Sequence, residues 1–442
     1  MHLLLRCQTS LWMMKTQNLP VDVNKKLDVY PFTLEETWAE RLFVHLPGIK
    51  KSPYPHLDRQ FIGSDSRQRV HLVISGFDTL AQLVVIQAAL VAHFPNYHGS
   101  DRIPLRTRIS VITPDIEPAR DRFIARYGNL FDNSYYRFID IDKRTCTLHR
   151  PLYAGRREDF VDVEWEFIKG RLEDAYMRDR LTKWAEDASR QLTLVVCSGD
   201  DEKDMAQAMS LPHAVYEREI SILVRQHYRY FSSSLEGQDR FKCLRTFGMD
   251  DEGYDVNLPL FRLARYLNYF YEYNPEYLPD TPTVLPEDEV NEKWIKATLE
   301  SSVNRYSNLY NVMTIPTKLR SLGHDENDVD RFYALRKDEV EALSKTEHNR
   351  WCVERLICGQ RPCTDEEREM IRSQIVEVRK GLREKSEKSY YKNVKKAHFD
   401  LCAFDELSIN DQGVDMKDYD RALTACIPLI VNTYYETYGK KQ

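Results

Sequence analysis

The chain has 442 residues, of which 42% are hydrophobic and 30% are charged, and its formal net charge is −6. This length predicts about two or three domains, and the apolar content excludes a disordered chain. Because acidic and basic residues are interspersed, we expect no nucleic-acid-binding surface. The nine cysteines are scattered without a Cys-x-x-Cys pair, which indicates reduced thiols in a cytoplasmic protein and no zinc site.

We expect no targeting or membrane signal in the N-terminal residues. No apolar run approaches the roughly 18 residues of a membrane span, so none is predicted. The start of the chain has an early apolar patch but neither the long apolar region nor the small-residue cleavage site of a signal peptide, so none is expected. We interpret residues 1–60 as an N-terminal extension with one short helix, 34–43, which Thr33 can cap.

The next segment, 61–273, alternates buried-type strands with helices. Strand 70–75, a glycine turn, helix 80–94 and strand 108–113 form a βαβ unit, and Asp115 follows where a Rossmann fold places its ribose ligand. Further elements are predicted as strands at 135–142, 192–197 and 220–224 and as helices at 172–192, 200–209 and 257–272. The pattern predicts an α/β Rossmann-like domain with a parallel sheet. This half resembles the regulatory nucleotide-binding domain of potassium-uptake proteins (TrkA-N-like).

The dinucleotide fingerprint of this unit is degraded to Gly76-x-Asp78-x-x-Ala81. Its middle position is normally glycine, so that the backbone can approach a pyrophosphate. Asp78 places a carboxylate there, which opposes the attraction of about 0.3–1 kcal/mol between a helix N-terminus and a phosphate. We therefore expect a structural core with an empty or altered site and no NAD. In the alternative, Gly76, Asp78 and Asp115 bind a cofactor in a NAD-dependent enzyme or NAD(H)-sensing regulator.

A second strand–glycine–helix turn occurs at Ser198-Gly199-Asp200. It lies at a strand C-terminus, the edge where α/β folds bind ligands. Capping of the following helix by Ser198 or Asp200 explains it more simply. The Tyr- and Phe-rich helix 257–272 is predicted to cover the sheet or an interface.

The rest of the chain is predicted to be a separate, mainly α-helical domain, 288–442, after a Pro-rich linker at 274–287. Its helices are expected at 294–310, at 328–343, which continues into the segment 343–359, and at 364–380. The last of these has a capping box at Thr364 and Glu367. A last helix, 420–431, is expected to be interrupted near Pro428.

The segment 343–359 has two different faces when it is placed on a helix at roughly 100° per residue. One face is apolar and contains Leu343, Val353, Leu356 and Ile357. The opposite face contains His348, Trp351, Cys352 and Arg355. Because a core-facing helix needs one apolar face, the second face predicts a second partner, either a layer of protein or a flat charged ligand. Alternatively, Trp351 packs on protein while its charged neighbours reach water.

The residues 335–432 resemble the ryanodine-receptor (RyR) repeat. The first half is carried by LSKTEHNRW, running on to Leu356 and Gly359, and the second half lies within 395–431. The second half has family spacing at Leu401, Phe404, Leu407, Tyr419, Asp420 and Ala422. The resemblance implies a small helical module with a pocket where an adenine ring stacks on aromatic side chains. Gln360 stands where the family often has an aromatic residue, so one wall of the pocket is missing or comes from elsewhere.

This resemblance implies roles for individual side chains. Trp351 would stack on a base, either Arg350 or Arg355 would pair with phosphate, and His348 would lie beside them. Lysines near Lys395 would add phosphate contacts, unless the basic run 379–396 is only a solvated loop or helix end. The base or ribose would be read by Asn349, Asp405 and Asp420. Tyr419 is either a second wall or a core residue.

No arrangement of catalytic residues stands out, so we predict that the protein is not an enzyme. His348 and Cys352 could imitate a nucleophile–base pair, but a binding face is the better interpretation. We expect a ligand-sensing regulatory or effector protein that forms a homo-oligomer, with an adenine-type nucleotide as ligand. RyR-like modules occur in some bacterial defence proteins, which suggests anti-phage signalling. The remaining alternative is a purely structural module in which protein covers Trp351.

Overall fold

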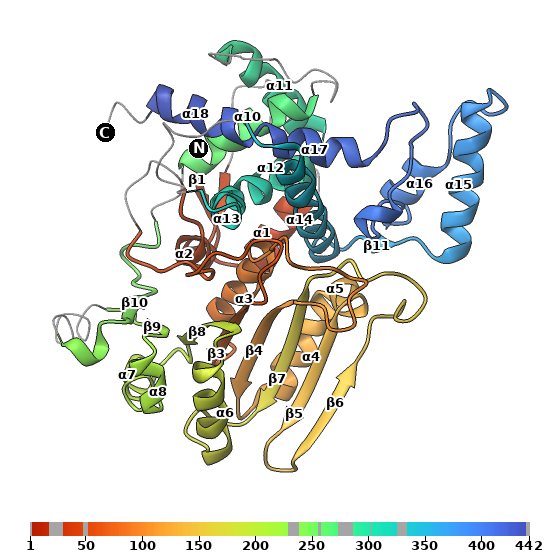
Figure 1. Ribbon diagram of the computed structural model, residues 1–442. Helices are drawn as coiled ribbons and strands as arrows, with labels where there is room; N and C mark the ends of the chain where they lie inside the picture. Colours follow the sequence, from red (N-terminus) through yellow and green to blue (C-terminus); the bar gives the residue numbers. More distant parts are fainter. Residues whose placement is uncertain are drawn as a thin grey trace.

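The computed structural model describes residues 2–16, 30–46, 52–228, 238–254, 258–272, 286–300, 302–324 and 334–438. It combines an α/β part, built on an eight-stranded sheet, with a helical part that lies above one end of the sheet in Figure 1. In the described part of the chain, no helix is both long and apolar enough to cross a membrane.

The central sheet is mostly parallel. Its strands are β3 (Arg69–Ser75), β4 (Thr107–Thr113), β5 (Tyr135–Asp140), β6 (Thr145–His149), β7 (Val163–Lys169), β8 (Arg190–Val196), β9 (Ser221–Arg225) and β10 (Leu244–Phe247). They are ordered β10-β9-β8-β3-β4-β7-β5-β6, and only β6 runs antiparallel to its neighbour. Taken from β7 to β10, six strands have the order 3-2-1-4-5-6 of a doubly wound sheet. The predicted parallel α/β fold is therefore confirmed.

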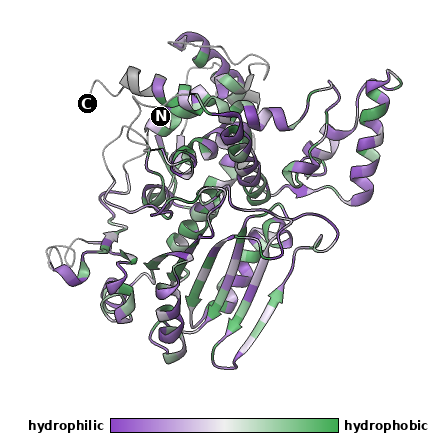
Figure 2. Cartoon of the chain, viewed as in Figure 1, coloured by the Kyte–Doolittle hydropathy of each residue, from purple (hydrophilic) through white to green (hydrophobic). Residues whose placement is uncertain are grey.

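Helices cover both faces of this sheet. One face packs against α3 (Thr79–Val91), α4 (Ile116–Arg126) and α5 (Gly128–Asp132), and the other packs against α6 (Ala175–Glu186), α7 (Asp201–Met209) and α8 (His213–Glu217). Figure 2 shows hydrophobic residues concentrated in the strands and in α3, the helix between the sheet and the helical part. Each predicted strand of this half is present, and the predicted helix 172–192 is shorter, as α6.

Strand β7 was not predicted, although it lies between β4 and β5 near the middle of the sheet. Its sequence alternates Trp165 and Phe167 with Glu164 and Glu166, a pattern typical of a half-exposed strand. Both glutamates are nevertheless buried. Arg108 on β4 pairs with both carboxylates, and this compensates for the cost of burying them.

The N-terminal segment is part of this fold. It contains β1 (His2–Leu4), α1 (Gln8–Thr16), β2 (Tyr30–Phe32) and α2 (Leu34–Phe43). Thr33 caps α2 as predicted, because its side chain accepts a hydrogen bond from the Glu36 N–H at 3.2 Å. Helix α2 packs on α3 and α1 packs on α12, so this segment contacts both parts of the molecule.

The helical part includes the helix that was predicted at 257–272 to cover the sheet or an interface. It contains α10 (Leu258–Glu272), α11 (Glu287–Glu300), α12 (Ser302–Met313), α13 (Ile315–Ser321), α14 (Lys337–Ile357), α15 (Asp365–Arg379), α16 (Lys388–Asn393), α17 (Lys417–Ala425) and α18 (Ile427–Tyr438). Helix α10 packs on α11, α12, α17 and α18. The single helix predicted at 294–310 is divided between α11 and α12. The predicted linker, 274–287, lies almost entirely outside the described residues.

One hydrophobic core joins the two parts. Buried residues of α3 and α5 belong to the same cluster as Val353 and Leu356 of α14. Leu343 is buried as well, so the predicted apolar face of α14 is confirmed. Helices α15 and α16 and the short pair β11 (Arg361–Pro362) and β12 (Ala397–His398) extend away from this core on one side (Figure 1). The capping box at Thr364 and Glu367 is present as predicted.

Candidate functional site

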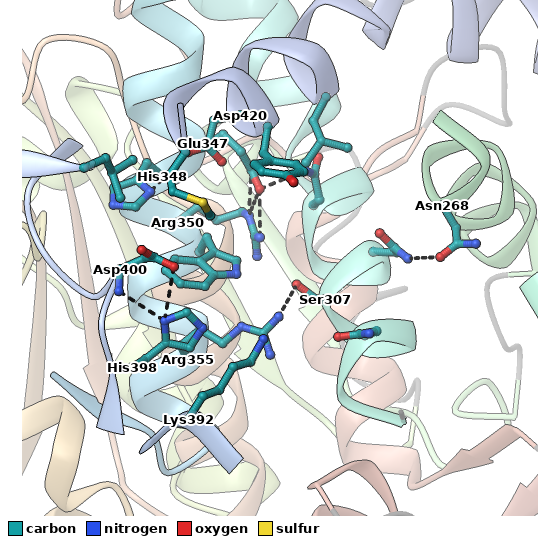
Figure 3. A pocket seen from close by; sticks show the side chains of 18 of the residues that line it. Asn268, Ser307, Glu347, His348, Arg350, Arg355, Lys392, His398, Asp400 and Asp420 are labelled. Atoms are coloured by element: carbon teal, nitrogen blue, oxygen red, sulfur yellow. Dashed lines mark hydrogen bonds and ion pairs between the residues drawn. The ribbon is translucent and has the colours of Figure 1, made fainter. Parts of the chain in front are cut away.

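The second face of α14 borders a pocket of about 290 Å³ inside the helical part (Figure 3). Five elements, α10, α12, α14, α16 and α17, and the segment after β12 contribute most of its lining. The polar and aromatic lining consists of Asn268, Asn304, Ser307, Asn308, Asn311, Glu347, His348, Arg350, Trp351, Arg355, Lys392, His398, Asp400, Tyr419 and Asp420. The second partner predicted for α14 is therefore a layer of protein that contains a pocket.

Trp351 lies at the centre of the aromatic contacts of this pocket. Its ring stacks against His348 at a centroid distance of 5.6 Å and meets His398 edge-on at 4.9 Å. The Arg355 guanidinium lies 5.4 Å from the ring centroid. Although Trp351 packs against the core, it stays partly exposed, so protein does not cover it completely.

The two arginines of α14 that were alternative phosphate ligands have different surroundings. Arg350 is fully buried and donates to Glu347 at 2.8–3.0 Å and to Glu354 at 2.8 Å. Arg355 lies one helical turn after Trp351 and donates to Ser307 at 3.3 Å. Arg350 therefore holds the protein together, and Arg355 is the arginine whose head group faces the pocket.

Glu347 organises the buried frame behind the pocket. Besides Arg350, it accepts from Lys318 of α13 at 2.6 Å and from Asn311 of α12 at 2.8 Å. Burial disfavours its charge, but the nearby cations Arg350 and Lys318 lower the pKa of Glu347 to about 2. The carboxylate is therefore ionised and ties together α12, α13 and α14.

His348 forms a buried ion pair with Asp420 of α17. Its Nδ1 lies 3.1 Å from the Asp420 carboxylate, and its Nε2 lies 2.9 Å from the Cys402 carbonyl oxygen. With an acceptor at each nitrogen, the ring satisfies both only as the imidazolium. Burial opposes this charge, but the Cys352 sulfur and the Asp420 hydrogen bond raise the pKa of His348 well above its usual value.

The contacts among Cys352, His348 and Asp420 resemble those of a catalytic triad with a cysteine nucleophile. The Cys352 Sγ lies 3.5 Å from the His348 Nε2. That nitrogen is already bonded to a carbonyl, however, and the thiol is fully buried, with burial raising the pKa of Cys352. An activated thiolate needs a lowered pKa and access to substrate, so this arrangement supports no nucleophile.

His398 presents an unsatisfied donor to the pocket. The backbone N–H of Asp400 donates to the His398 Nδ1 at 3.2 Å, so the neutral ring carries its proton on Nε2. Burial and the charges of Lys392 and Arg355 lower the pKa of His398 well below its usual value. The Nε2 atom is buried and has no hydrogen-bond partner among the described residues. A ligand acceptor there would remove the cost of an unpaired polar group.

A row of amides on α12 forms the opposite wall. Asn311 donates to Glu347, and Asn308 donates to the Asn268 oxygen of α10 at 2.9 Å. The Asn268 Nδ2 is itself buried without an acceptor within the described ranges. This wall was not predicted, because nothing in the local sequence indicates that α10 and α12 face α14.

Three predicted ligand residues do not line the pocket. Asn349 is buried on another side of α14, and Lys395 is exposed between α16 and β12. Asp405 has a side chain that is 57% exposed and pairs with Lys345 and Lys417. The basic run 379–396 does reach the pocket, but through Lys392 of α16.

The degraded fingerprint of the sheet has a different environment. Gly76 has a φ of +101°, and a Cβ there would collide with the Cys197 carbonyl. The glycine is therefore needed for the close approach of the backbone at Cys197. Asp78 caps α3 by accepting the Ala81 N–H at 2.9 Å, and its other oxygen pairs with Arg225 of β9. Asp115 precedes α4, is exposed and makes no capping hydrogen bond.

The second glycine turn also serves the fold. Asp200 caps α7, accepting from the Lys203 N–H at 3.1 Å, as one of the two predicted alternatives proposed. Ser198 instead donates to Asp204 at 2.5 Å. The polar side chains at this edge of the sheet therefore bond to one another and to helix ends.

Metal ligands and known relatives give no further guidance. Among the described residues, no group of three or more His, Cys, Asp and Glu side chains could hold a metal ion. No family model, curated protein or solved structure matches the chain.

Proposed function

We propose that the helical part is a ligand-sensing module whose pocket binds a nucleotide-type small molecule. The observation that carries this proposal is the partly exposed Trp351 beside Arg355, a flat aromatic surface next to a cation. Aromatic rings of ligands stack on such surfaces, and guanidinium groups are preferred partners of phosphate.

The size of the pocket restricts the ligand. A volume of about 290 Å³ is at the lower end of the range of roughly 300–1,000 Å³ that is usual for small-molecule sites. An enclosed ligand would therefore be a single nucleotide unit. The unsatisfied donors of His398 and Asn268 add hydrogen bonds that a preformed binding site would provide.

The RyR resemblance remains part of this proposal. The aromatic wall that the family places after the glycine is absent at Gln360, but His398 stands edge-on to Trp351 and Tyr419 also lines the pocket. Tyr419 would then be a wall, whereas Asp420 would position His348 and read a donor of the ligand. We further propose that the protein acts as a regulator or effector and forms a homo-oligomer. Its pathway would be bacterial anti-phage signalling.

The α/β part would serve as a scaffold of the TrkA-N-like type. Its fingerprint residue Asp78 satisfies the N-terminus of α3 and pairs with Arg225, so a pyrophosphate would have to displace a built-in ion pair. This favours the scaffold over a NAD-dependent enzyme or a NAD(H)-sensing regulator that uses Gly76 and Asp115.

A thermal-shift titration tests the proposal. The panel contains AMP, ATP, NAD, ADP-ribose and cyclic di- and trinucleotides, applied to the wild type and to Trp351→Ala. A ligand at 100 times its Kd adds about 2.7 kcal/mol to stability, which gives a readily measured shift. We expect one class of nucleotide to shift the wild type and not the Trp351 variant.

A matched variant guards this result against general damage. Tyr176→Ala removes an aromatic side chain from α6 that is 53% exposed and lies outside the pocket, and it should keep the shift. A shift that persists in Trp351→Ala but disappears in Asp115→Ala would transfer the function to the sheet. No shift with any nucleotide would leave the structural module as the better interpretation.

A further inference from the structure

We infer that the ligand of this pocket carries a dianionic phosphate monoester, held at one end by Arg355, Lys392 and His398. This inference rests on the proposed function and assigns the chemical class of its ligand. Figure 3 shows these three side chains at one end of the pocket, with His348 and Asp420 at the other.

The charges of the pocket support a dianion. Each lining carboxylate has a cationic partner, since Glu347 pairs with Arg350 and Lys318, Asp400 with Lys388, and Asp420 with His348. One further carboxylate, Glu354, is shared by Arg350 at 2.8 Å and Arg355 at 3.7 Å. When the lining residues and these partners are counted together, the cations exceed the anions by two. Two negative charges on a ligand would balance this excess.

The surplus is located at the end that contains Arg355 and Lys392. Lys392 pairs with no carboxylate among the described residues and is only partly exposed. Burial, followed by the positive charge of Arg355, lowers the pKa of Lys392 to about 8. The two cations come from different helices, α14 and α16, and repel each other at this end of the pocket. An anion between them would change this repulsion into two attractions.

The hydrogen-bonding groups at this end require an acceptor. The Nε2–H of His398 is buried and unpaired, and the Arg355 and Lys392 head groups can only donate. A phosphate offers acceptor oxygens to all three, whereas the ring of a base, which carries donors of its own, satisfies them less well. The base would instead lie along Trp351 towards Asp420. At the phosphate end, the Asp400 carboxylate is paired with Lys388 at 2.8 Å.

Isothermal titration with matched ligands tests this assignment. The probes are the four common nucleoside 5′-monophosphates, their nucleosides, their 3′,5′-cyclic monophosphates, which carry one charge fewer, and inorganic phosphate. We expect one monophosphate to bind about 10-fold or more tightly than its nucleoside, because charge-assisted hydrogen bonds are lost without the phosphate. The cyclic form should lie between them. Inorganic phosphate should bind weakly and compete with the monophosphate.

Two lysine variants locate the phosphate. Lys392→Ala should weaken binding of the monophosphate by about 10-fold and leave the affinity for the nucleoside unchanged. Lys395→Ala, which removes an exposed lysine three residues later, should change neither affinity. Melting curves of both ligand-free variants establish that they fold.

The possible failures are distinguishable. If a nucleoside binds as tightly as its monophosphate, the phosphate assignment is wrong while the proposed function stands. If Lys395→Ala weakens binding and Lys392→Ala does not, the phosphate lies outside the pocket and the assignment is also wrong. If neither these probes nor the nucleotides of the thermal-shift panel bind, the proposed function itself fails.

Discussion

The carboxyl edge of the sheet and the pocket in the helical part differ in how their polar groups are satisfied. In the sheet, one Asp78 oxygen caps α3 and the other pairs with Arg225, so the carboxylate is fully used by the protein. In the pocket, His398 and Asn268 keep buried donors without partners, and cations exceed anions. Doubly wound α/β folds usually bind their ligands at the carboxyl edge of the sheet. Buried atoms without partners occur at both locations, since the Arg225 Nε has none among the described residues, but those of His398 and Asn268 belong to side chains that line a pocket.

The largest expected effect comes from breaking the frame of the pocket. Glu347→Ala leaves Lys318 and Arg350 buried with fewer counter-charges, and removing one partner of a buried ion pair typically costs about 3–5 kcal/mol. We expect the free energy of unfolding in urea to fall by this amount and ligand binding to be lost. Glu369→Ala, an exposed glutamate on α15, is the matched control and should change stability by less than about 0.5 kcal/mol.

The lowered pKa of Glu347 also predicts a loss of folding stability at acidic pH. Because the pKa of Glu347 is lowered to about 2 in the folded state, its contribution to stability is present above the unfolded pKa of roughly 4.3. It is lost as the pH falls through the folded pKa. Glu347→Ala should therefore show a smaller loss of stability than the wild type between about pH 4 and pH 2. Equal losses would mean that Glu347 does not carry the transition.

A smaller loss of stability is expected when the capping carboxylate at the edge of the sheet is removed. Asp78→Ala removes the cap of α3 and the ion-pair partner of Arg225. We therefore expect a loss of about 1–3 kcal/mol in the free energy of unfolding. Asp115 occupies the corresponding place before α4 but makes no capping hydrogen bond. Asp115→Ala should therefore cost less than about 0.5 kcal/mol. If the two variants lose equal stability, the role assigned to Asp78 in the scaffold is wrong.

The sequence predicted the architecture better than the pairing of its elements. Strands and helices with strong periodicity were found, because the period depends on local sequence. Strand β7 was missed, since its glutamates are buried by virtue of cations on other elements, among them Arg108 on β4 and Arg180 on α6. The division between α11 and α12 and the packing of α10 on them likewise depend on tertiary contacts.

The site was predictable where one helix decides the geometry. Arg355 follows Trp351 by four residues and shares its face, whereas Asn349 lies roughly 200° away and points elsewhere. Helical geometry alone could therefore have favoured Arg355 over Arg350 and excluded Asn349. In contrast, no local rule distinguishes Lys392 from Lys395, because the path of the chain between α16 and β12 determines which lysine reaches the pocket.

The smallest expected effect is the dependence of ligand affinity on pH. Lys392 of α16 is surrounded by Arg355 on α14, Lys388 on its own helix, and His398 and Asp400 at β12, and its pKa is lowered to about 8. A bound phosphate stabilises the ammonium and raises this pKa, so affinity should fall by up to about 10-fold per pH unit above pH 8. Below about pH 6 the phosphate monoester gains a proton, so affinity should fall there as well.

Calorimetry measures this coupling directly. Near pH 8.5, binding should take up a fraction of a proton, which appears as a dependence of the binding enthalpy on the ionisation enthalpy of the buffer. Lys392→Ala should abolish this proton uptake, and Lys395→Ala should retain it. Proton uptake that survives in Lys392→Ala would assign the titrating group to another side chain. The Lys392 ammonium would then carry its charge both before and after the phosphate binds.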